Sequence, residues 1–477
     1  MMTWEKLLSV ARVAELFGKP ASVGDSRTEF ERDYGRVLFS TPFRRLQDKT
    51  QVFPLEQHDS VRTRLTHSLE VSSVARSLGK LAASWMVAEG LIDPEKLDDI
   101  QTLAATCGLL HDLGNPPFGH SGERAIQSWF AKNKLILDPL KDSPLRSQLN
   151  NDFLLFEGNA QTIRLLSTIQ LMSYEQQYTE YGLNLTCASF SVASKYISAS
   201  DRIDSNNDKS KRNHSMAKPG YFASEEEVIN FVREKTGTGA ARHPISYLVE
   251  ACDDLVYCTG DLEDSLKKGL VGWDEVRSEL LYLSDGDAVV VNVLEWSEKK
   301  VNYIQEDRGR RDELVIQAFR TYAMNAIKHA ALEIFKNRYK AIMFGQYTHE
   351  LARDENCKTT RLLDACQAFL RSRIFPLHEV TRVEIMGRKV IHDLMDLFWE
   401  AVEACSEGEA EPRDKRSFPA QIFDLISTNY RQAFERGVRL RKLPEQYCRL
   451  QLVADQIAGM TDTHACSLHR QLMNGGH

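Results

Sequence analysis

The sequence predicts a mainly α-helical fold, and three observations support that prediction. Apolar residues recur with the period of a helix in one stretch after another. Alternating strand patterns are scarce, and the best short candidate, DAVVVNVL at 287–294, fits a helix equally well. No run of about eighteen apolar residues occurs, so no membrane-spanning helix is expected. The 477 residues, 42% hydrophobic and 27% charged, suit a large globular chain with a sizeable core.

The predicted helices follow one another along the chain. Residues 1–18 are expected to form an amphipathic helix, since they lack the basic start of a signal peptide. A second helix follows His67 and extends to Trp85, and a third, over 100–111, places His111 on its apolar face. Further helical stretches are predicted at 245–268, 311–337, 385–405, 418–437 and 445–460.

Two polar segments interrupt this pattern. Residues 198–227 predict either a disordered surface loop or a lid over a site, and residues 405–417 predict a solvated linker. We therefore expect an N-terminal helical arm at 1–40, a catalytic core at 41–275 and a helical C-terminal region at 276–477 packed on that core.

Charge and cysteine content narrow the class of protein. Nine cysteines without a C-x-x-C pair argue against a disulfide framework or a zinc finger and favour a reducing cytoplasm. The net charge of −7 argues against bulk affinity for nucleic acid. The basic strip RGVRLRK at 436–442 offers phosphate contacts, but a solvated helix face is the simpler interpretation.

The stretch LLHDLGNPPFGHSGE at 109–123 concentrates ionisable side chains at a helix end. His111 continues the apolar face, and burying its neighbour Asp112 is costly without a cation, which a metal ion supplies. Two more ligands are expected, His67 in the first turn of its helix and Asp253 in the stretch SYLVEACDDLVYCTGDLED.

Two imidazoles and two carboxylates suit a divalent ion such as Mn²⁺, Mg²⁺, Fe²⁺, Co²⁺ or Zn²⁺. Four protein ligands leave positions for water and phosphate oxygens, a pattern that favours metal-assisted hydrolysis of a phosphoryl group. Asp253, Tyr257 and Asp261 recur at i, i+4 and i+8 and so share one helix face. That spacing fits a site wall and a solvent-facing stripe equally well.

His120 and Glu123 lie three residues apart, directly after a turn that Pro116, Pro117 and Gly119 make rigid. A histidine near the metal that is not a ligand can protonate a leaving oxygen, and Glu123 can orient and charge it. The simpler role for Glu123 is favourable electrostatics in the first turn of a helix, and both roles are compatible.

These residues resemble a known family. His67, His111-Asp112 and Asp253 resemble the H…HD…D signature of HD-domain phosphohydrolases. The strings KTQVF, GLLHDLGNPPFGHSGE, FEGNAQTIRLL, HPISYLVEACDDLVYCTGDLEDSLKKG and VADQIAGMTD resemble one branch, the deoxyguanosine triphosphate triphosphohydrolases (dGTPases) and related dNTP triphosphohydrolases. The resemblance implies a helical HD fold elaborated with additional helices. It implies hydrolysis of dGTP, or another dNTP, to deoxynucleoside and inorganic triphosphate, and a homo-oligomer, often a hexamer.

The resemblance also implies roles for individual residues. It implies four metal ligands, namely His67, His111, Asp112 and Asp253, with Mn²⁺ or Mg²⁺ favoured. It implies that His120 is the general acid for the 5′ oxygen and that Glu123 is its partner. Residues implied to bind substrate are Gln51 at the sugar 3′-hydroxyl, Tyr257 and Asp261 at the deoxyribose, and Arg64, Lys195, Tyr196 and Lys218 near the triphosphate. Glu157 resembles an acid near the metal, and Ile197 stands where the family usually has proline.

Two alternatives remain open. Another HD-type hydrolase, such as a 5′-deoxynucleotidase, has the same metal ligands but is disfavoured by the extra strings. A nucleotide sensor or single-strand DNA-binding assembly is disfavoured because all four ligand positions are filled. Binding of single-stranded DNA is nevertheless compatible with an enzyme.

Overall fold

The computed structural model describes residues 1–18, 26–56, 58–141, 143–169, 181–206, 208, 212–301 and 308–474. Helices make up most of these residues, which confirms the predicted mainly α fold class. Strands β1 (Ser198–Ala199) and β2 (Pro219–Tyr221) pair in parallel as a small two-stranded sheet. No helix in the described ranges has the length and apolar character needed to cross a membrane.

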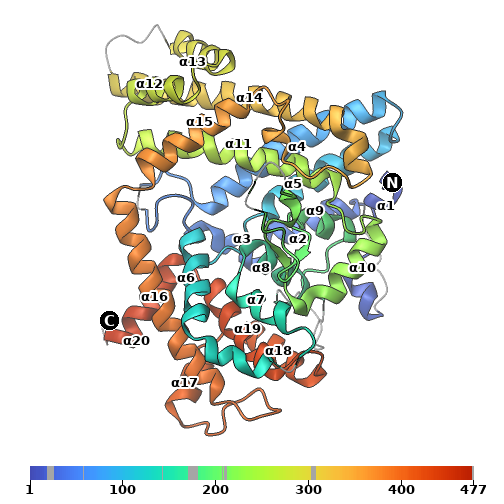
Figure 1. The fold of residues 1–477 in the computed structure, drawn as a ribbon, viewed down its shortest axis with the longest axis vertical. Helices are drawn as coiled ribbons and strands as arrows, with labels where there is room; N and C mark the ends of the chain where they lie inside the picture. Colours follow the sequence, from blue (N-terminus) through green and yellow to red (C-terminus); the bar gives the residue numbers. More distant parts are fainter. Residues whose placement is uncertain are drawn as a thin grey trace.

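The helices form two groups, each around its own apolar core, seen at the top and bottom of Figure 1. The first group comprises α1 (Trp4–Leu7), α4 (Arg64–Ala88), α11 (Pro244–Lys267), α12 (Trp273–Leu283), α13 (Ala288–Val301), α14 (Arg308–Met343) and α15 (Thr360–Phe369). The second comprises α3 (Thr41–Arg45), α6 (Gly119–Lys132), α7 (Arg146–Leu154), α8 (Gly158–Arg164), α10 (Glu226–Thr236), α16 (His378–Glu403), α17 (Phe418–Asp424), α18 (Thr428–Leu440), α19 (Glu445–Ala458) and α20 (Asp462–Asn474).

Among the described helices, α16 contributes Val380 to the first core, and three further helices contribute buried side chains to both cores, namely α2 (Glu29–Leu38), α5 (Leu97–Leu110) and α9 (Cys187–Ala193). Along α5, Cys107 still belongs to the first core, whereas Leu109 belongs to the second. Tight helix packing fixes this position, because a Cβ on Gly108 would lie 2.6 Å from the Cα of Ser72 on α4. The end of α5, where His111 follows, therefore lies where the two cores meet.

Shorter helical segments connect these elements. The 3₁₀ segments are Val13–Phe17, Leu46–Asp48, Pro94–Lys96, Lys134–Leu140, His214–Met216, Ala223–Glu225 and Leu351–Arg353, and the π-helical segments are Leu165–Ile169 and Leu370–Ile374. The stretch 287–294, for which strand and helix were both allowed, lies almost entirely within α13.

Two predicted helices are wrong in extent. The N-terminal helix is broken, because Arg12 is extended, bridges Thr186 and directs its guanidinium to the buried Asp33 (3.0 Å). These contacts outweigh the local amphipathic pattern. The stretch 418–437 is two helices, α17 and α18, because the chain leaves α17 after Leu425 and starts again after Ser427.

The polar segment 198–227 is folded where the structure describes it. Residues 219–223 are buried, and Ile197, just before β1, donates its backbone N–H to the carbonyl of Ser215 (2.9 Å). A proline at position 197 would lack that donor. Residues 207 and 209–211 lie outside the described residues, and the lid stays a prediction.

Candidate active site

His67 and His111 come from two helices that pack against each other. Thr63 caps α4 by accepting a hydrogen bond from the backbone N–H of Thr66 (3.4 Å), which places His67 in the first turn. His111 directly follows α5, and its Nδ1 lies 2.8 Å from the carbonyl oxygen of Gly108. The two imidazole centroids are 5.2 Å apart. The helix contacts therefore bring together two histidines that lie far apart in the sequence.

Two carboxylates complete this group, which we call the HD cluster (His67, His111, Asp112 and Asp253). Nε2 of His111 lies 3.5 Å from Asp112 and 3.4 Å from Asp253, and Nε2 of His67 lies 3.1 Å from Asp253. His67, His111 and Asp112 each offer a ligand atom within 4.8 Å of the others, and Asp253 adjoins this group through its contacts with both histidines.

The hydrogen bonding of His111 provides a test of whether a cation fits the HD cluster. A carbonyl oxygen only accepts, so Nδ1 of His111 carries the hydrogen directed at Gly108. Nε2 then presents a lone pair to two carboxylates, and this buried atom has no hydrogen-bond partner in the described chain. When His111 is neutral, this lone pair and the carboxylates repel one another, so the site requires a positive charge there, either a proton on Nε2 or a metal ion. Two nitrogen and two oxygen donors suit a divalent metal ion.

The shifted pKa values of His111 and Asp112 also show that the cluster stabilises positive charge. Burial alone would lower the pKa of His111, but the charges of Asp112 and Asp253 raise it to about 9. Burial would raise the pKa of Asp112, but Arg64 and the histidines lower it to about 2. The nearby guanidinium of Arg64 contacts Asp112 at 2.6 Å. The HD cluster therefore favours positive charge at its centre.

The turn after Asp112 is held by its own side chains and by close packing. Asn115 donates from its amide to Asp112 (2.5 Å), and Phe118 adopts a left-handed conformation with φ of 62° before α6. A Cβ on Gly122 would lie 2.0 Å from the carbonyl oxygen of Pro117, so this close approach requires glycine. The turn thereby directs the chain from His111 and Asp112 straight into α6.

His120 and Glu123 form a hydrogen-bonded pair in the first turn of α6. Nδ1 of His120 lies 2.7 Å from the Glu123 carboxylate, whose other oxygen accepts the backbone N–H of Gly158 (2.8 Å). Burial would raise the pKa of Glu123, but its hydrogen bond and charge interaction with His120 lower that pKa to about 2. Glu123 is buried, whereas 69% of the His120 side chain is exposed. An ionised carboxylate thus orients an imidazole that remains free to meet a ligand.

A cavity of about 550 Å³ opens beside the HD cluster. Of the predicted site residues, eight line it, namely Gln51, Arg64, His67, Asp112, His120, Lys195, Asp253 and Tyr257. His111, Glu123, Tyr196, Lys218 and Asp261 do not line it but lie behind or beside those that do. This arrangement places candidate metal ligands, cations and the His120 imidazole around one space.

The i, i+4, i+8 face of α11 runs from the cluster into the protein. Asp253 reaches the histidines and Tyr257 lines the cavity, while Asp261 is buried and its Oδ2 has no partner among the described residues. Burial and the charge of Asp261 raise the pKa of Tyr257, so its hydroxyl stays protonated. Oε1 of Gln51, at the same cavity, is also unpartnered. Burial raises the pKa of Asp261, and Oε1 of Gln51 is the unpartnered acceptor at the cavity wall itself.

Two lysines lie near the Tyr196 ring, and one of them, Lys195, lines the cavity. The ammonium of Lys195 lies 5.9 Å from the ring centroid and that of Lys218 lies 5.7 Å from it. Lys218 also pairs with the buried Glu157 (2.7 Å), so Glu157 contacts a cation and not the HD cluster. Lys195 and Arg64 are thus cations at the cavity wall, and Lys218 lies behind them.

Sequence reasoning missed the far wall of the cavity. Five residues from α15, the π-helical segment and turn after it, and α16 line that wall, namely Gln367, Arg371, Phe375, Val380 and Glu384. Arg124, on α6, lies there too, and its guanidinium is 3.3 Å from Glu384. Gln367 and Arg371 share a helix face at i, i+4, but this spacing alone is typical of any solvated helix.

A second histidine–carboxylate group lies nearby, and we call it the Glu250 cluster (His214, Glu250 and Glu350). Nε2 of His214 lies 3.0 Å from Glu250 and 3.2 Å from Glu350. Three cations already face it: Arg242 at 2.8 Å and Lys195 at 3.5 Å from Glu250, and Arg353 at 3.6 Å from Glu350. The protein's own cations thus balance these carboxylates, and no metal ion is needed.

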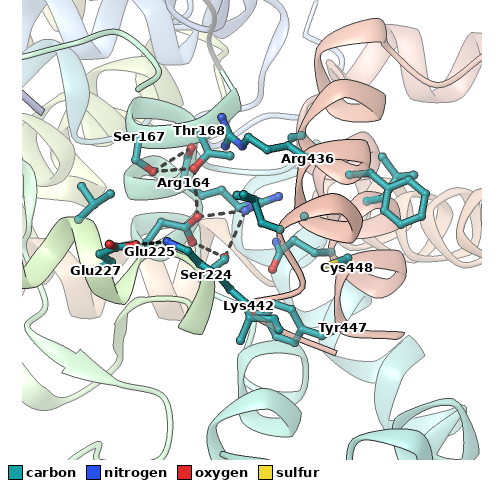
Figure 2. A pocket seen from close by; sticks show the side chains of 18 of the residues that line it. Arg164, Ser167, Thr168, Ser224, Glu225, Glu227, Arg436, Lys442, Tyr447 and Cys448 are labelled. Carbon is teal, nitrogen blue, oxygen red and sulfur yellow. Dashed lines mark hydrogen bonds and ion pairs between the residues drawn. The ribbon is translucent and has the colours of Figure 1, made fainter. Parts of the chain in front are cut away.

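A smaller cavity of about 130 Å³ lies apart from both clusters (Figure 2). Arg164 there contacts Glu225 (3.0 Å) and the hydroxyl of Ser224 (3.2 Å), and Lys442 contacts Glu227 (2.6 Å). The basic strip 436–442 thus borders this cavity, although Lys442 remains mostly exposed, as a solvated face predicts. Since these cations have carboxylate partners, we assign no anion to this cavity.

Comparisons with known proteins agree with this picture. The model of the HD domain matches residues 64–204, and that of the phosphohydrolase-associated domain matches residues 413–471. The chain is 34% identical to a deoxyguanosinetriphosphate triphosphohydrolase-like protein of Listeria innocua, over 99% of both chains. It is 31% identical to the deoxyguanosinetriphosphate triphosphohydrolase of Klebsiella pneumoniae strain 342, over 93% of both, and 32% identical to that of Yersinia enterocolitica, over 96% of both.

Proposed function

The chain belongs to the deoxyguanosinetriphosphate triphosphohydrolase family of HD-domain hydrolases, and from that premise we propose that it hydrolyses dGTP to deoxyguanosine and inorganic triphosphate in a metal-dependent reaction. The broader statement, that it is an HD-type phosphohydrolase, follows from the family itself. The substrate, the metal dependence and the roles of individual residues are the content of the proposal.

The HD cluster is the proposed metal site, with His67, His111, Asp112 and Asp253 as ligands. The orphaned Nε2 of His111 supports this assignment most directly. A divalent ion held there, with Mn²⁺ or Mg²⁺ favoured, supplies a more acidic attacking water and polarises a phosphoryl oxygen. Fe²⁺, Co²⁺ and Zn²⁺ fit the same donors.

The protein's own residues then bind the triphosphate and protonate the leaving group. Arg64, Lys195 and Lys218 are the proposed cations for the triphosphate, beside Tyr196. Because Nδ1 of His120 is directed to Glu123, Nε2 is the atom available to give a proton to the 5′ oxygen as the bond to the α-phosphorus breaks. Ionised Glu123 stabilises the protonated imidazole before that transfer.

We propose that residues on the remaining walls of the cavity bind the sugar and the base of the nucleotide. Gln51 is the proposed acceptor for the 3′-hydroxyl, and the Tyr257 ring, with Asp261 behind it, closes on the deoxyribose so that no 2′-hydroxyl fits. Phe375 offers an aromatic face for the base. The carboxylate of Glu384 can accept from the ring N–H and the neighbouring amino group of guanine. Adenine and the pyrimidines do not present these two donors side by side.

The pairing of His120 with Glu123 at the same cavity as the HD cluster is the observation that carries the proposal. Purified protein with Mn²⁺ and dGTP is expected to release deoxyguanosine by HPLC and inorganic triphosphate by ³¹P NMR. Release of dGMP and pyrophosphate would contradict attack with the 5′ oxygen as leaving group. Hydrolysis of dGMP without hydrolysis of dGTP would support a 5′-deoxynucleotidase instead.

The oligomeric state, the cellular compartment and the binding of single-stranded DNA are proposals that rest on the family resemblance. We propose a homo-oligomer, with a hexamer favoured, in the cytoplasm. Light scattering coupled to size exclusion tests the oligomer. A salt-dependent gel shift tests binding of single-stranded DNA, and an affinity that does not change with salt would exclude phosphate contacts.

A further inference from the structure

Glu250 is a buried carboxylate on α11, three residues before the proposed metal ligand Asp253. Its oxygens are directed at three positively charged or protonatable groups. Oε2 accepts from Arg242 at 2.8 Å, while Oε1 lies 3.0 Å from His214 and 3.5 Å from the ammonium of Lys195. Glu250 therefore joins the cavity-lining Lys195 to a buried network that lines no part of the cavity.

That network is rigid. Arg242 is only 2% exposed, and its guanidinium stacks over the Tyr247 ring at 4.4 Å from the centroid. The backbone N–H of His214 donates to the carbonyl of Thr348 (2.9 Å), which ties the network to the loop after α14. A carboxylate held on both oxygens cannot rotate away from Lys195 without breaking a buried ion pair.

Lys195 has only two carboxylates within ion-pair distance in the described chain, Glu250 and Asp253, the latter at 3.8 Å. On the proposed function, Asp253 directs its charge to the metal. Glu250 is then the anchor that remains for the ammonium group. We infer that Glu250 is a positioning residue that holds Lys195 at the cavity wall for a bound triphosphate, with Arg242 and His214 fixing Glu250.

The test uses the full-length protein with Mn²⁺ and the variant Glu250→Asp. Aspartate keeps the charge that buried Arg242 requires but withdraws the carboxylate from Lys195. We expect the kcat for dGTP to fall about 10- to 100-fold and the Kd for inorganic tripolyphosphate, measured by calorimetry, to rise by a similar factor. Manganese content should stay at the wild-type level. The matched control is Glu350→Asp, which touches the same His214 but not Lys195 and should change either constant less than about threefold.

A double-mutant cycle with Lys195→Ala separates positioning from a general structural role. If Glu250 acts through Lys195, adding Glu250→Asp to Lys195→Ala changes either constant less than about twofold. If the two effects multiply, the inference is wrong. Should Glu250→Asp fail to fold by circular dichroism, the isosteric Glu250→Gln enters the same cycle.

The kcat for dGTP and the Kd for tripolyphosphate together distinguish this inference from the proposed function on which it rests. If wild-type protein binds tripolyphosphate but releases none from dGTP, the proposed function is contradicted. The double-mutant cycle measured on the Kd for tripolyphosphate then tests the role of Glu250 by itself. Wild-type protein that turns over dGTP, with multiplicative effects in the cycle, contradicts the inference alone. Wild-type protein that neither turns over dGTP nor binds tripolyphosphate contradicts both.

Discussion

The HD cluster and the Glu250 cluster both combine histidine with carboxylates but differ in how their charges and hydrogen bonds are balanced. In the HD cluster, the Nε2 of His111 faces two carboxylates without a hydrogen-bond partner. In the Glu250 cluster, His214 contacts both carboxylates at normal hydrogen-bond distance, and Arg242, Lys195 and Arg353 supply positive charge. The HD cluster also has Arg64 at 2.6 Å from Asp112, but Nε2 of His111 still has no partner among the described residues. A group of metal-binding residue types thus indicates a metal site where a buried donor atom is left without a partner.

The largest effect is expected from Asp253→Asn in the HD cluster. The amide keeps the size of the side chain but removes the negative charge that His67 and His111 face. We expect the variant to lose its bound manganese, as measured by inductively coupled plasma mass spectrometry. We also expect its activity to fall by more than about a thousandfold. A variant that keeps its metal and turns over dGTP would place the ion elsewhere.

His120→Ala is expected to have the next largest effect, and it separates acid catalysis from metal binding. Removal of a general acid typically costs a factor of about 10² to 10⁴ in kcat. Manganese content should be unchanged, because His120 contacts Glu123 and not the HD cluster. Loss of the metal in this variant would make His120 a ligand.

Three of the proposed metal ligands and the His120–Glu123 pair could be predicted from sequence because each lies at a marked helix end, whereas the fourth, Asp253, lies within α11. His111-Asp112 and His120–Glu123 flank one turn, and His67 follows a capping threonine. The wall formed by Phe375 and Glu384 could not be predicted, because packing of α15 and α16 brings those residues to the cavity from a region without a motif.

The Glu250 cluster escaped prediction for a related reason. His214 lies in a polar segment, Glu350 follows α14, and only the tertiary fold joins them to Glu250. The broken N-terminal helix shows the same limit, since Arg12 is held by Asp33 and Thr186 from distant parts of the chain. Long-range contacts of this kind leave no local pattern.

Glu384→Gln is expected to have a moderate effect, and on base preference above all. The amide exchanges one acceptor for a donor opposite the guanine edge, so kcat/KM for dGTP should fall about 10- to 100-fold. The kcat/KM for the other dNTPs should change less than about threefold, as steady-state assays of all four substrates will measure. An equal loss for every dNTP would remove Glu384 from base recognition.

His214→Gln, in the Glu250 cluster, is expected to have the smallest effect. The amide can still donate to Glu250, and Arg242 and Lys195 remain. We expect wild-type manganese content and a fall in kcat of less than about fivefold. A decrease in bound manganese would mean that this cluster also holds an ion and that the contrast between the two clusters is false.

The most direct measurement is anomalous X-ray scattering from crystals of the protein grown with Mn²⁺. The account predicts one strong anomalous peak per chain, within coordination distance of His67, His111, Asp112 and Asp253, and none among His214, Glu250 and Glu350. A peak in the Glu250 cluster, or an HD cluster that stays empty at saturating Mn²⁺, would contradict it.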